Sequence, residues 1–327
     1  MTDSLHVTQP LPVSSDGPPT FTRVLLGIDV GTASLAAARW AAANVAPRAD
    51  AILAHVMPCS DRDGDDGHNG DGTPAMQTPR ERRSSIAGGL SGFAATLDAA
   101  SARSVLRSGS ASHWLSTIAN DAEASLVVLG RRSDANRTRV GEPNVIERVA
   151  RRTSASVLVV PERTGESVAR VVAAVDDSPF APRVLAVAAR LARMHELALA
   201  IVHVLSPVMG TYARVVRPSR SSDAGETVVL PPPPPTAPDA APLRLPIRVG
   251  RWLVELASAH QTLSRDRMEV TIGDPARELT RAATPNDRTL VVVGMRGADS
   301  APVGSVGSVA RELLTRGTMA VLAVNGL

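Results

Sequence analysis

One sequence pattern occurs twice in this chain, and the repeat restricts the fold more than any other feature. The first occurrence is an apolar strand, 24–29, which ends in Asp29 and leads through Gly-Thr-Ala-Ser into an Ala-rich helix. The second is 171–176, which ends in Asp176 and leads through Asp-Ser-Pro into a helix with an apolar face. Both indicate a strand–turn–helix unit. Because 327 residues are enough for two ordinary domains, we expect two fused copies of one domain.

The later elements repeat in the same order. Strands 52–56 and 200–204 both end in His-Val, and each precedes an irregular segment. The pattern then predicts, in both copies, a second helix (near 81–99 and 248–263), a third strand (104–107 and 268–272), a third helix, a fourth strand (126–129 and 290–293), a fourth helix and a last strand (157–160 and 320–324). At the start of the third helices, Ser112 is a candidate cap and Pro275 suits a first turn.

Strands that alternate with helices of this length imply parallel pairing through right-handed crossovers. The sequence therefore predicts an α/β fold with two tandem doubly wound open parallel sheets, Rossmann-like, of five strands each. We expect a disordered tail at 1–20, the first domain at 21–163 and the second at 166–327. With only 2% aromatic residues, the cores must be built from Val, Leu, Ile and Ala, which suits buried parallel strands. The ligand crevice of such a sheet lies beyond the carboxyl ends of its strands.

Composition argues against several classes of protein. All 35 basic residues are Arg, yet they are mixed with 32 acidic residues, so we expect no nucleic-acid partner. There is no apolar run of the roughly 18 residues that a membrane helix needs, and we expect no membrane association. A single cysteine, Cys59, and a start without a signal-peptide pattern favour a cytoplasmic protein. The insertion 206–246 contains the run Pro231–Pro235 and is expected to be mobile.

The segment richest in chemical information begins where the fourth strand of the second copy ends. It reads Gly294-x2-Gly297-x9-Gly307-Ser308 and opens into a helix with an apolar stripe. Glycines permit close backbone approach, and the amides at the start of a helix attract anions, so phosphate is the expected ligand. Ser308 could donate its hydroxyl or cap the helix. Taken alone, the same residues also fit an ordinary Gly-rich turn.

These motifs together resemble the ATP-binding branch of the universal stress protein family: strand–Asp, His-Val, Gly-Asp-Pro and Gly-x2-Gly-x9-Gly-Ser follow one another in that order. The resemblance covers nearly the whole chain except the tail and the two insertions. It implies binding of ATP with Mg²⁺, and a regulatory role in the stress response. It also implies contacts from Asp176 to adenosine, Val204 to adenine, Gly294 and Gly297 to the ribose-phosphate region, Gly307 and Ser308 to the phosphates, and Val309 through its backbone. Without the resemblance, Asp176 would be read as a capping or surface carboxylate.

The first copy keeps the spacing of this motif but not its residues. Counted from Gly130, Ser133 replaces the second glycine, Pro143 the third and Asn144 the serine. Proline has no amide hydrogen for a phosphate, and Glu142 adds a negative charge beside it. We therefore expect the first copy to bind ATP poorly or not at all. The four arginines of this loop could attract an anion or a partner, or form a solvated basic surface: Arg131, Arg132, Arg137 and Arg139.

No dedicated enzyme is expected. A Walker lysine is impossible without Lys, and no nucleophile elbow or kinase-like catalytic loop occurs. His55 and His203 lie inside strands and are interpreted as structural. Two alternatives to the regulatory ATP-binding protein stay open: a slow ATPase or self-phosphorylating protein that uses Ser305 or Ser308, and an interaction module without nucleotide. Protein partners are expected but unidentified, and a homodimer is open, as is pairing of the two copies through their final strands.

Overall fold

The computed structural model describes residues 21–29, 31–58, 78–132, 144–205, 267–283, 288–296 and 305–325. The expected tail, the whole insertion 206–246, the expected helix 248–263 and the residues Gly297 and Ser133 lie outside the described residues. The same holds for Glu142, Pro143, Arg137 and Arg139.

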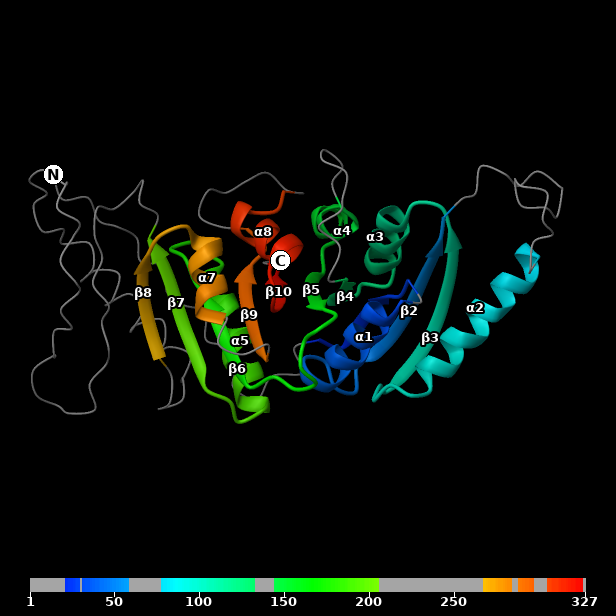
Figure 1. The fold of residues 1–327 in the computed structure, drawn as a ribbon, viewed down its shortest axis with the longest axis horizontal. Helices are drawn as coiled ribbons and strands as arrows, with labels where there is room; N and C mark the ends of the chain where they lie inside the picture. The colour runs from blue at the N-terminus through cyan, green and yellow to red at the C-terminus, as the bar shows by residue number, and fades with distance from the viewer. Residues whose placement is uncertain are drawn as a thin grey trace, which may run out of the picture.

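The two copies run one after the other along the chain (Figure 1). The first contains β1 (Arg23–Gly27), α1 (Thr32–Asn44), β2 (Asp50–Met57), α2 (Pro79–Ala94), β3 (Ser101–Ser108), α3 (Ala111–Asp121), β4 (Leu126–Arg131), α4 (Val145–Arg152) and β5 (Ser156–Pro161). The second contains β6 (Arg170–Ala174), α5 (Ala181–Met194), β7 (Leu199–Leu205), β8 (Arg267–Ile272), α7 (Pro275–Ala283), β9 (Thr289–Gly294), α8 (Ser308–Arg316) and β10 (Ala320–Val324).

All ten strands form one sheet in the order β3-β2-β1-β4-β5-β10-β9-β6-β7-β8. Within each copy the strands pair in parallel, and the strand order reverses beside the first strand, as in a doubly wound sheet. The predicted α/β fold with two tandem parallel-sheet domains is confirmed.

The copies meet through their final strands. β5 and β10 pair antiparallel, with Val159 opposite Val321 and Leu158 opposite Leu322. This is the pairing that the sequence left open as an alternative to association of two chains. Because each final strand covers the edge of the other, neither is left with unpaired backbone on that side.

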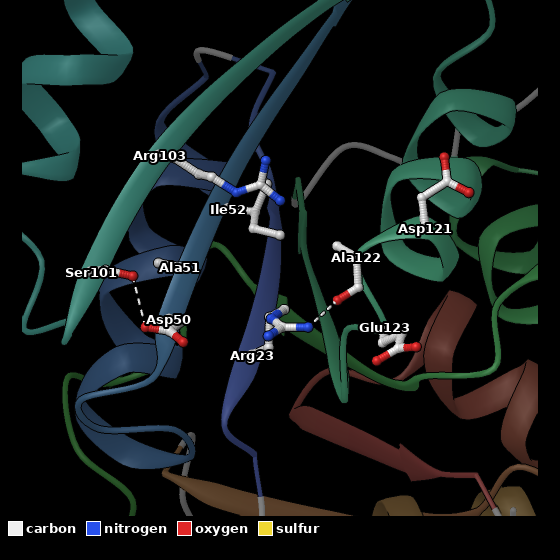
Figure 2. A pocket seen from close by; sticks show the side chains of 9 residues that line it. All are labelled: Arg23, Asp50, Ala51, Ile52, Ser101, Arg103, Asp121, Ala122 and Glu123. Carbon is white, nitrogen blue, oxygen red and sulfur yellow. Dashed lines mark hydrogen bonds between the residues drawn. The ribbon is translucent and has the colours of Figure 1, made fainter.

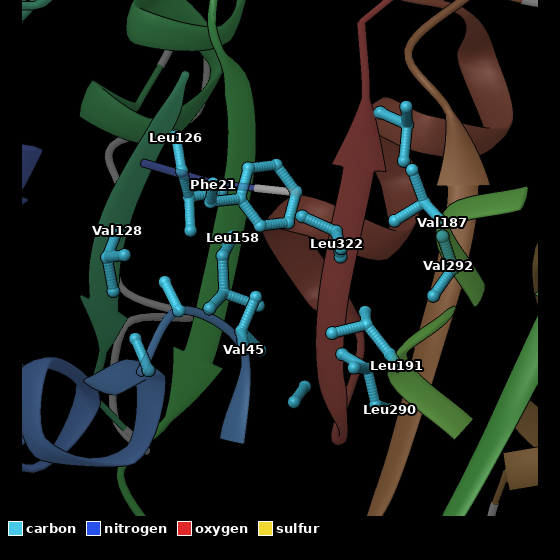
Figure 3. Close-up of a cluster of buried hydrophobic side chains, with 14 of the residues drawn as sticks. Phe21, Val45, Leu126, Val128, Leu158, Val187, Leu191, Leu290, Val292 and Leu322 are labelled. Carbon is cyan, nitrogen blue, oxygen red and sulfur yellow. The ribbon is translucent and has the colours of Figure 1, made fainter. Parts of the chain in front are cut away.

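Helices cover both faces of the sheet. The buried side chains of α1, α2 and α5 belong to one apolar cluster, and those of α3, α4, α7 and α8 to the other. Each cluster contains residues from both copies, so the core continues across the β5–β10 junction. Figure 3 shows this on one face, where Leu158 of the first copy lies beside Leu322 of the second.

The connection between the copies is hydrogen-bonded to α1. The Trp40 indole donates to the Gly165 carbonyl at 2.9 Å, and the Asn44 amide donates to the Glu166 carbonyl at 3.0 Å. The Asn44 side-chain oxygen also accepts from the Val168 backbone amide at 2.9 Å. His195, the residue directly after α5, hydrogen-bonds to the Asn44 carbonyl oxygen at 2.7 Å. These contacts fix the start of the second copy against the first.

Several local expectations need correction. Ser112 does not cap α3, because the cap residue is Ser110 and Ser112 is buried inside the first turn. The second helix runs from Pro79 to Ala94 rather than 81–99, because Thr78 and Glu81 form a reciprocal capping box at its start. The strand expected at 104–107 extends over Ser101–Ser108, since β2 supplies backbone partners along its whole length. Pro275 does open α7, as predicted.

Candidate functional site

A cavity of about 340 Å³ opens at the carboxyl ends of β6, β7 and β9. Open α/β sheets bind their ligands at this edge. The first turns of α7 and α8 complete the walls. Its lining is mainly apolar, with one acidic and one basic side chain: Ala174, Val175, Asp176, Val202, Val204, Pro275, Leu279, Val293, Gly294, Arg296, Val306, Gly307, Ser308, Val309 and Ala310.

The structure brings six of the seven predicted site residues to this one cavity. They come from four elements that are far apart in the sequence: Asp176, Val204, Gly294, Gly307, Ser308 and Val309. The seventh, Gly297, lies outside the described residues. That these residues contact a nucleotide stays a prediction.

A histidine fixes the strand end that carries Asp176. The His203 ring nitrogen Nδ1 lies 2.8 Å from the Val175 carbonyl oxygen, which can only accept, so this nitrogen donates. Just beyond, the Asp176 carboxylate accepts from the Ser178 amide at 3.2 Å and from the Ser178 hydroxyl. The histidine therefore has a structural role here, as interpreted, and it places Asp176 at the cavity.

A tight turn carries the chain from β9 into the site. A side chain at Gly294 would place its Cβ 2.9 Å from the Arg296 carbonyl oxygen, which is too close. The carbonyl oxygen of the next residue, Met295, accepts a hydrogen bond from the backbone amide of Gly307 at 2.9 Å. This bond fastens the start of α8 to the end of β9 and occupies the Gly307 amide, while the expected contact of Gly307 with phosphate stays a prediction.

The start of α8 leaves amides without partners inside the helix. Its cap residue is Gly307, which has no side chain to accept a hydrogen bond, and Ser308 is the first helical residue. Ser308 therefore does not cap the helix, contrary to one of the two roles considered for it. The first intrahelical bond comes from the Arg311 amide, so those of Ser308, Val309 and Ala310 are not used within the helix. Together with the helix dipole they make this corner of the cavity attractive to an anion.

Arg296 is a candidate site residue that the sequence reasoning missed. It lines the cavity, and its Nε is a buried nitrogen without a hydrogen-bond partner in the structure. A buried donor of this kind is costly unless a ligand or another group satisfies it. The available signal was its position between Gly294 and Gly297, where a cation would lie next to the expected phosphates.

The matching helix of the first copy starts differently. Asn144 caps α4 with its side chain, which accepts from the Glu147 amide at 3.2 Å. Glu147 also brings a carboxylate into the first turn. One amide that could meet a phosphate is therefore occupied, and a negative charge stands beside it. Both differences agree with the expected asymmetry between the copies.

The expectation that the arginines of the first copy's loop attract an anion or a partner, or form a solvated basic surface, is wrong for Arg131. Its side chain is buried, and its guanidinium donates to the Leu314 carbonyl of α8 at 3.0 Å and reaches the Leu313 carbonyl at 3.5 Å. Burial lowers the pKa of Arg131 to about 10, which leaves the group charged at neutral pH. Arg132, by contrast, is exposed.

A second cavity, of about 300 Å³, lies in the first copy, where β1, β2 and β3 begin (Figure 2). Charged side chains surround it, among them Arg23, Arg103 and Asp50. Some bond within the protein: Arg23 donates to the Ala122 carbonyl at 2.6 Å, and Ser101 donates to Asp50 at 2.7 Å. This cavity lies at the amino ends of the strands and contains no predicted site residue, so the cavity of the second copy is the candidate site.

Comparison with known families supports this arrangement of two domains. The profile described as universal stress protein family matches residues 20–161 and again residues 168–325. The chain belongs to the universal stress protein family. Because the match occurs twice, it is a tandem universal stress protein, and membership supports a role in the stress response. Comparison of its sequence with curated proteins gave no match.

Solved structures of other proteins share the fold of this universal stress protein. A universal stress protein from Archaeoglobus fulgidus DSM 4304 superposes with a TM-score of 0.61 at 16% identity, covering 93% of this chain and 99% of that one. A putative universal stress protein from Pseudomonas aeruginosa UCBPP-PA14 gives 0.56 at 12% identity and covers 93% of both chains. Within the described ranges, no helix is both long and apolar enough to cross a bilayer.

Proposed function

We propose that the second copy binds ATP, carried with Mg²⁺, and that the protein is a nucleotide-dependent regulatory module of the stress response. The observation that carries this proposal is one cavity where a strand-end carboxylate, an apolar wall and the uncapped start of a helix meet. Each of these suits a different part of a nucleoside triphosphate.

The apolar wall suits the base. Val204, Val293 and Leu279 offer aliphatic surface of the kind that buries most of a small ligand. The Asp176 carboxylate stands at a strand end, where acidic side chains of doubly wound folds accept hydrogen bonds from ribose hydroxyls. The nucleoside would therefore lie beyond the carboxyl ends of β6 and β7.

The phosphates would lie at the start of α8. The amides of Ser308, Val309 and Ala310, which are not used within the helix, and the Arg296 guanidinium supply donors and positive charge for them. The described ranges contain no cluster of three or more side chains suited to hold a metal ion. Mg²⁺ would then be held chiefly by the phosphates, as this ion commonly is, rather than by a cage of protein ligands.

Isothermal titration calorimetry with ATP and magnesium tests the proposal. We expect one nucleotide per chain, bound by the second copy. A stoichiometry near two would show that the first copy also binds, and absence of binding would leave an interaction module without nucleotide. Nucleotide extracted from the purified protein separates the remaining alternative: retained ATP supports a regulatory site, whereas ADP with continuing phosphate release indicates a slow ATPase.

A further inference from the structure

Arg131 links the first copy to the helix that opens onto the candidate site. It is the last residue of β4, yet its guanidinium donates to the Leu314 carbonyl in the final turns of α8. The carbonyls of a helix's last turn lack intrahelical partners, and the dipole makes that end negative. A buried guanidinium at this place satisfies both the hydrogen bond and the charge.

The opposite end of the same helix lines the cavity. Ser308, Val309 and Ala310 form the first turn of α8 and belong to the cavity wall. The helix is only nine residues long, so a tilt of its carboxyl end also moves its amino end. Group positions at a binding site must be held to a fraction of an ångström, which gives the remote contact a direct consequence for the ligand.

The contact has no equivalent in the reverse direction. Counted from the strand-end glycines, Met295 of the second copy occupies the position of Arg131, and methionine has no hydrogen to donate. A surface pair adds to the link from the first copy, because Glu147 of α4 lies 4.0 Å from Arg311 of α8. Arg131 and Glu147 of the first copy thus contact α8 of the second, whereas the Met295 side chain cannot donate a matching hydrogen bond to the first copy.

We propose that Arg131 is a positioning residue for the phosphate part of the site, so that the second copy's site is complete only when the first copy is docked against it. This inference rests on the proposed function. It gives the first copy a task that does not require a nucleotide of its own: holding α8 at the angle where the amides of its first turn face the cavity.

The test compares Arg131→Met, Arg131→Lys and a matched control, Arg132→Met, in the full-length chain. Arg131→Met installs the residue that the second copy carries at the same position, and Arg131→Lys keeps a charged donor. Arg132→Met makes the same chemical change at the exposed neighbour. Calorimetry measures the affinity of each protein for ATP, tripolyphosphate and adenosine, and hydrogen exchange measures protection of the α8 amides.

We expect Arg131→Met to weaken ATP and tripolyphosphate binding by about tenfold, the size of one charge-assisted hydrogen bond, while adenosine binding stays unchanged. Arg131→Lys should recover most of the affinity, and Arg132→Met should behave like the original protein. Exchange at residues 311–316, whose amides bond within the helix, should be faster in Arg131→Met. An equal loss for adenosine would indicate general destabilisation and overturn the inference.

The failure of this inference can be told apart from failure of the proposed function. If the original protein binds no ATP, the nucleotide proposal is wrong, and hydrogen exchange of α8 still decides whether Arg131 holds the helix. If the original protein binds ATP and Arg131→Met binds it equally well, Arg131 does not position the site. Unchanged exchange at residues 311–316 in Arg131→Met also rejects its role, with or without ATP binding.

Discussion

Leu158 of β5 and Leu322 of β10 lie directly opposite each other at the antiparallel junction of the two copies. Both side chains are completely buried, in an apolar cluster that contains residues of both copies (Figure 3). The junction is therefore part of the core rather than a contact between two finished domains. It also keeps the first copy in place beside the helix that opens onto the candidate site.

The first prediction concerns this pair. Leu158→Ala and Leu322→Ala should each lower the free energy of unfolding by about 2–5 kcal/mol, because a buried cavity is left behind. Since the two residues face each other, the double variant should deviate from additivity by about 0.5–3 kcal/mol. Urea denaturation measures all three. The control combines Leu53→Ala in β2 with Leu322→Ala in β10, two strands that are not neighbours in the sheet, and its two losses of stability should be additive. Additive losses for the facing pair would contradict a shared core.

The second prediction isolates one backbone amide of the site. Ser308 is the first residue of α8, and Gly307 before it has φ −57° and ψ 150°, a conformation that proline accepts in the next residue. Ser308→Pro should therefore fold with unchanged or slightly higher stability, as proline suits the first helical position. It removes an amide donor, so ATP affinity measured by calorimetry should fall by about threefold to tenfold.

Ser308→Ala is the control for this change. It removes the hydroxyl and keeps the amide, so it separates the two donors of the same residue. If Ser308→Pro binds ATP as tightly as the original protein, the start of α8 does not hold the phosphates.

A third prediction uses the repeat as its own control. Asp176→Ala should weaken ATP binding by about tenfold or more, because it removes the carboxylate expected to bind the nucleoside. Its counterpart Asp29 accepts the Gly31 amide at 3.0 Å, as Asp176 accepts that of Ser178. Asp29→Ala should therefore cost similar stability, roughly 1 kcal/mol from the lost turn bonds, and leave ATP affinity unchanged. Calorimetry measures the ATP affinity of both variants, and thermal melting measures their stability. Equal affinity losses in the two variants would contradict the assignment of the nucleotide to the second copy.

The fourth prediction concerns the connection between the copies. Trp40→Phe keeps the aromatic packing and removes the hydrogen bond to the Gly165 carbonyl, so the free energy of unfolding should fall by about 1 kcal/mol. Trypsin should cut faster after the exposed Arg163 nearby. Trp114→Phe removes a comparable bond, to the Ser108 carbonyl, away from the connection. Equal cleavage rates in the two variants would show that Trp40 does not restrain this segment.

The sequence by itself determined the fold of each copy. The repeat of strand–Asp, His-Val and the glycine motif set the order of strands and helices, because hydrophobic periodicity and turn residues are local properties. The same local reasoning identified residues that meet at one cavity, such as Asp176 and Gly294, since the topology of a doubly wound sheet brings its strand ends together.

Only the tertiary structure decided how individual atoms are used. The Gly307 amide bonds Met295 and Ser308 does not cap α8, because both depend on where the end of β9 lies against the helix start. The hydrogen-bond partners of Arg131 could not be predicted from local sequence for the same reason. Its acceptors, the carbonyls of Leu313 and Leu314, are more than 180 residues away in the chain. A sequence pattern specifies which groups are present, while the partner of a buried polar group is set by packing between distant segments.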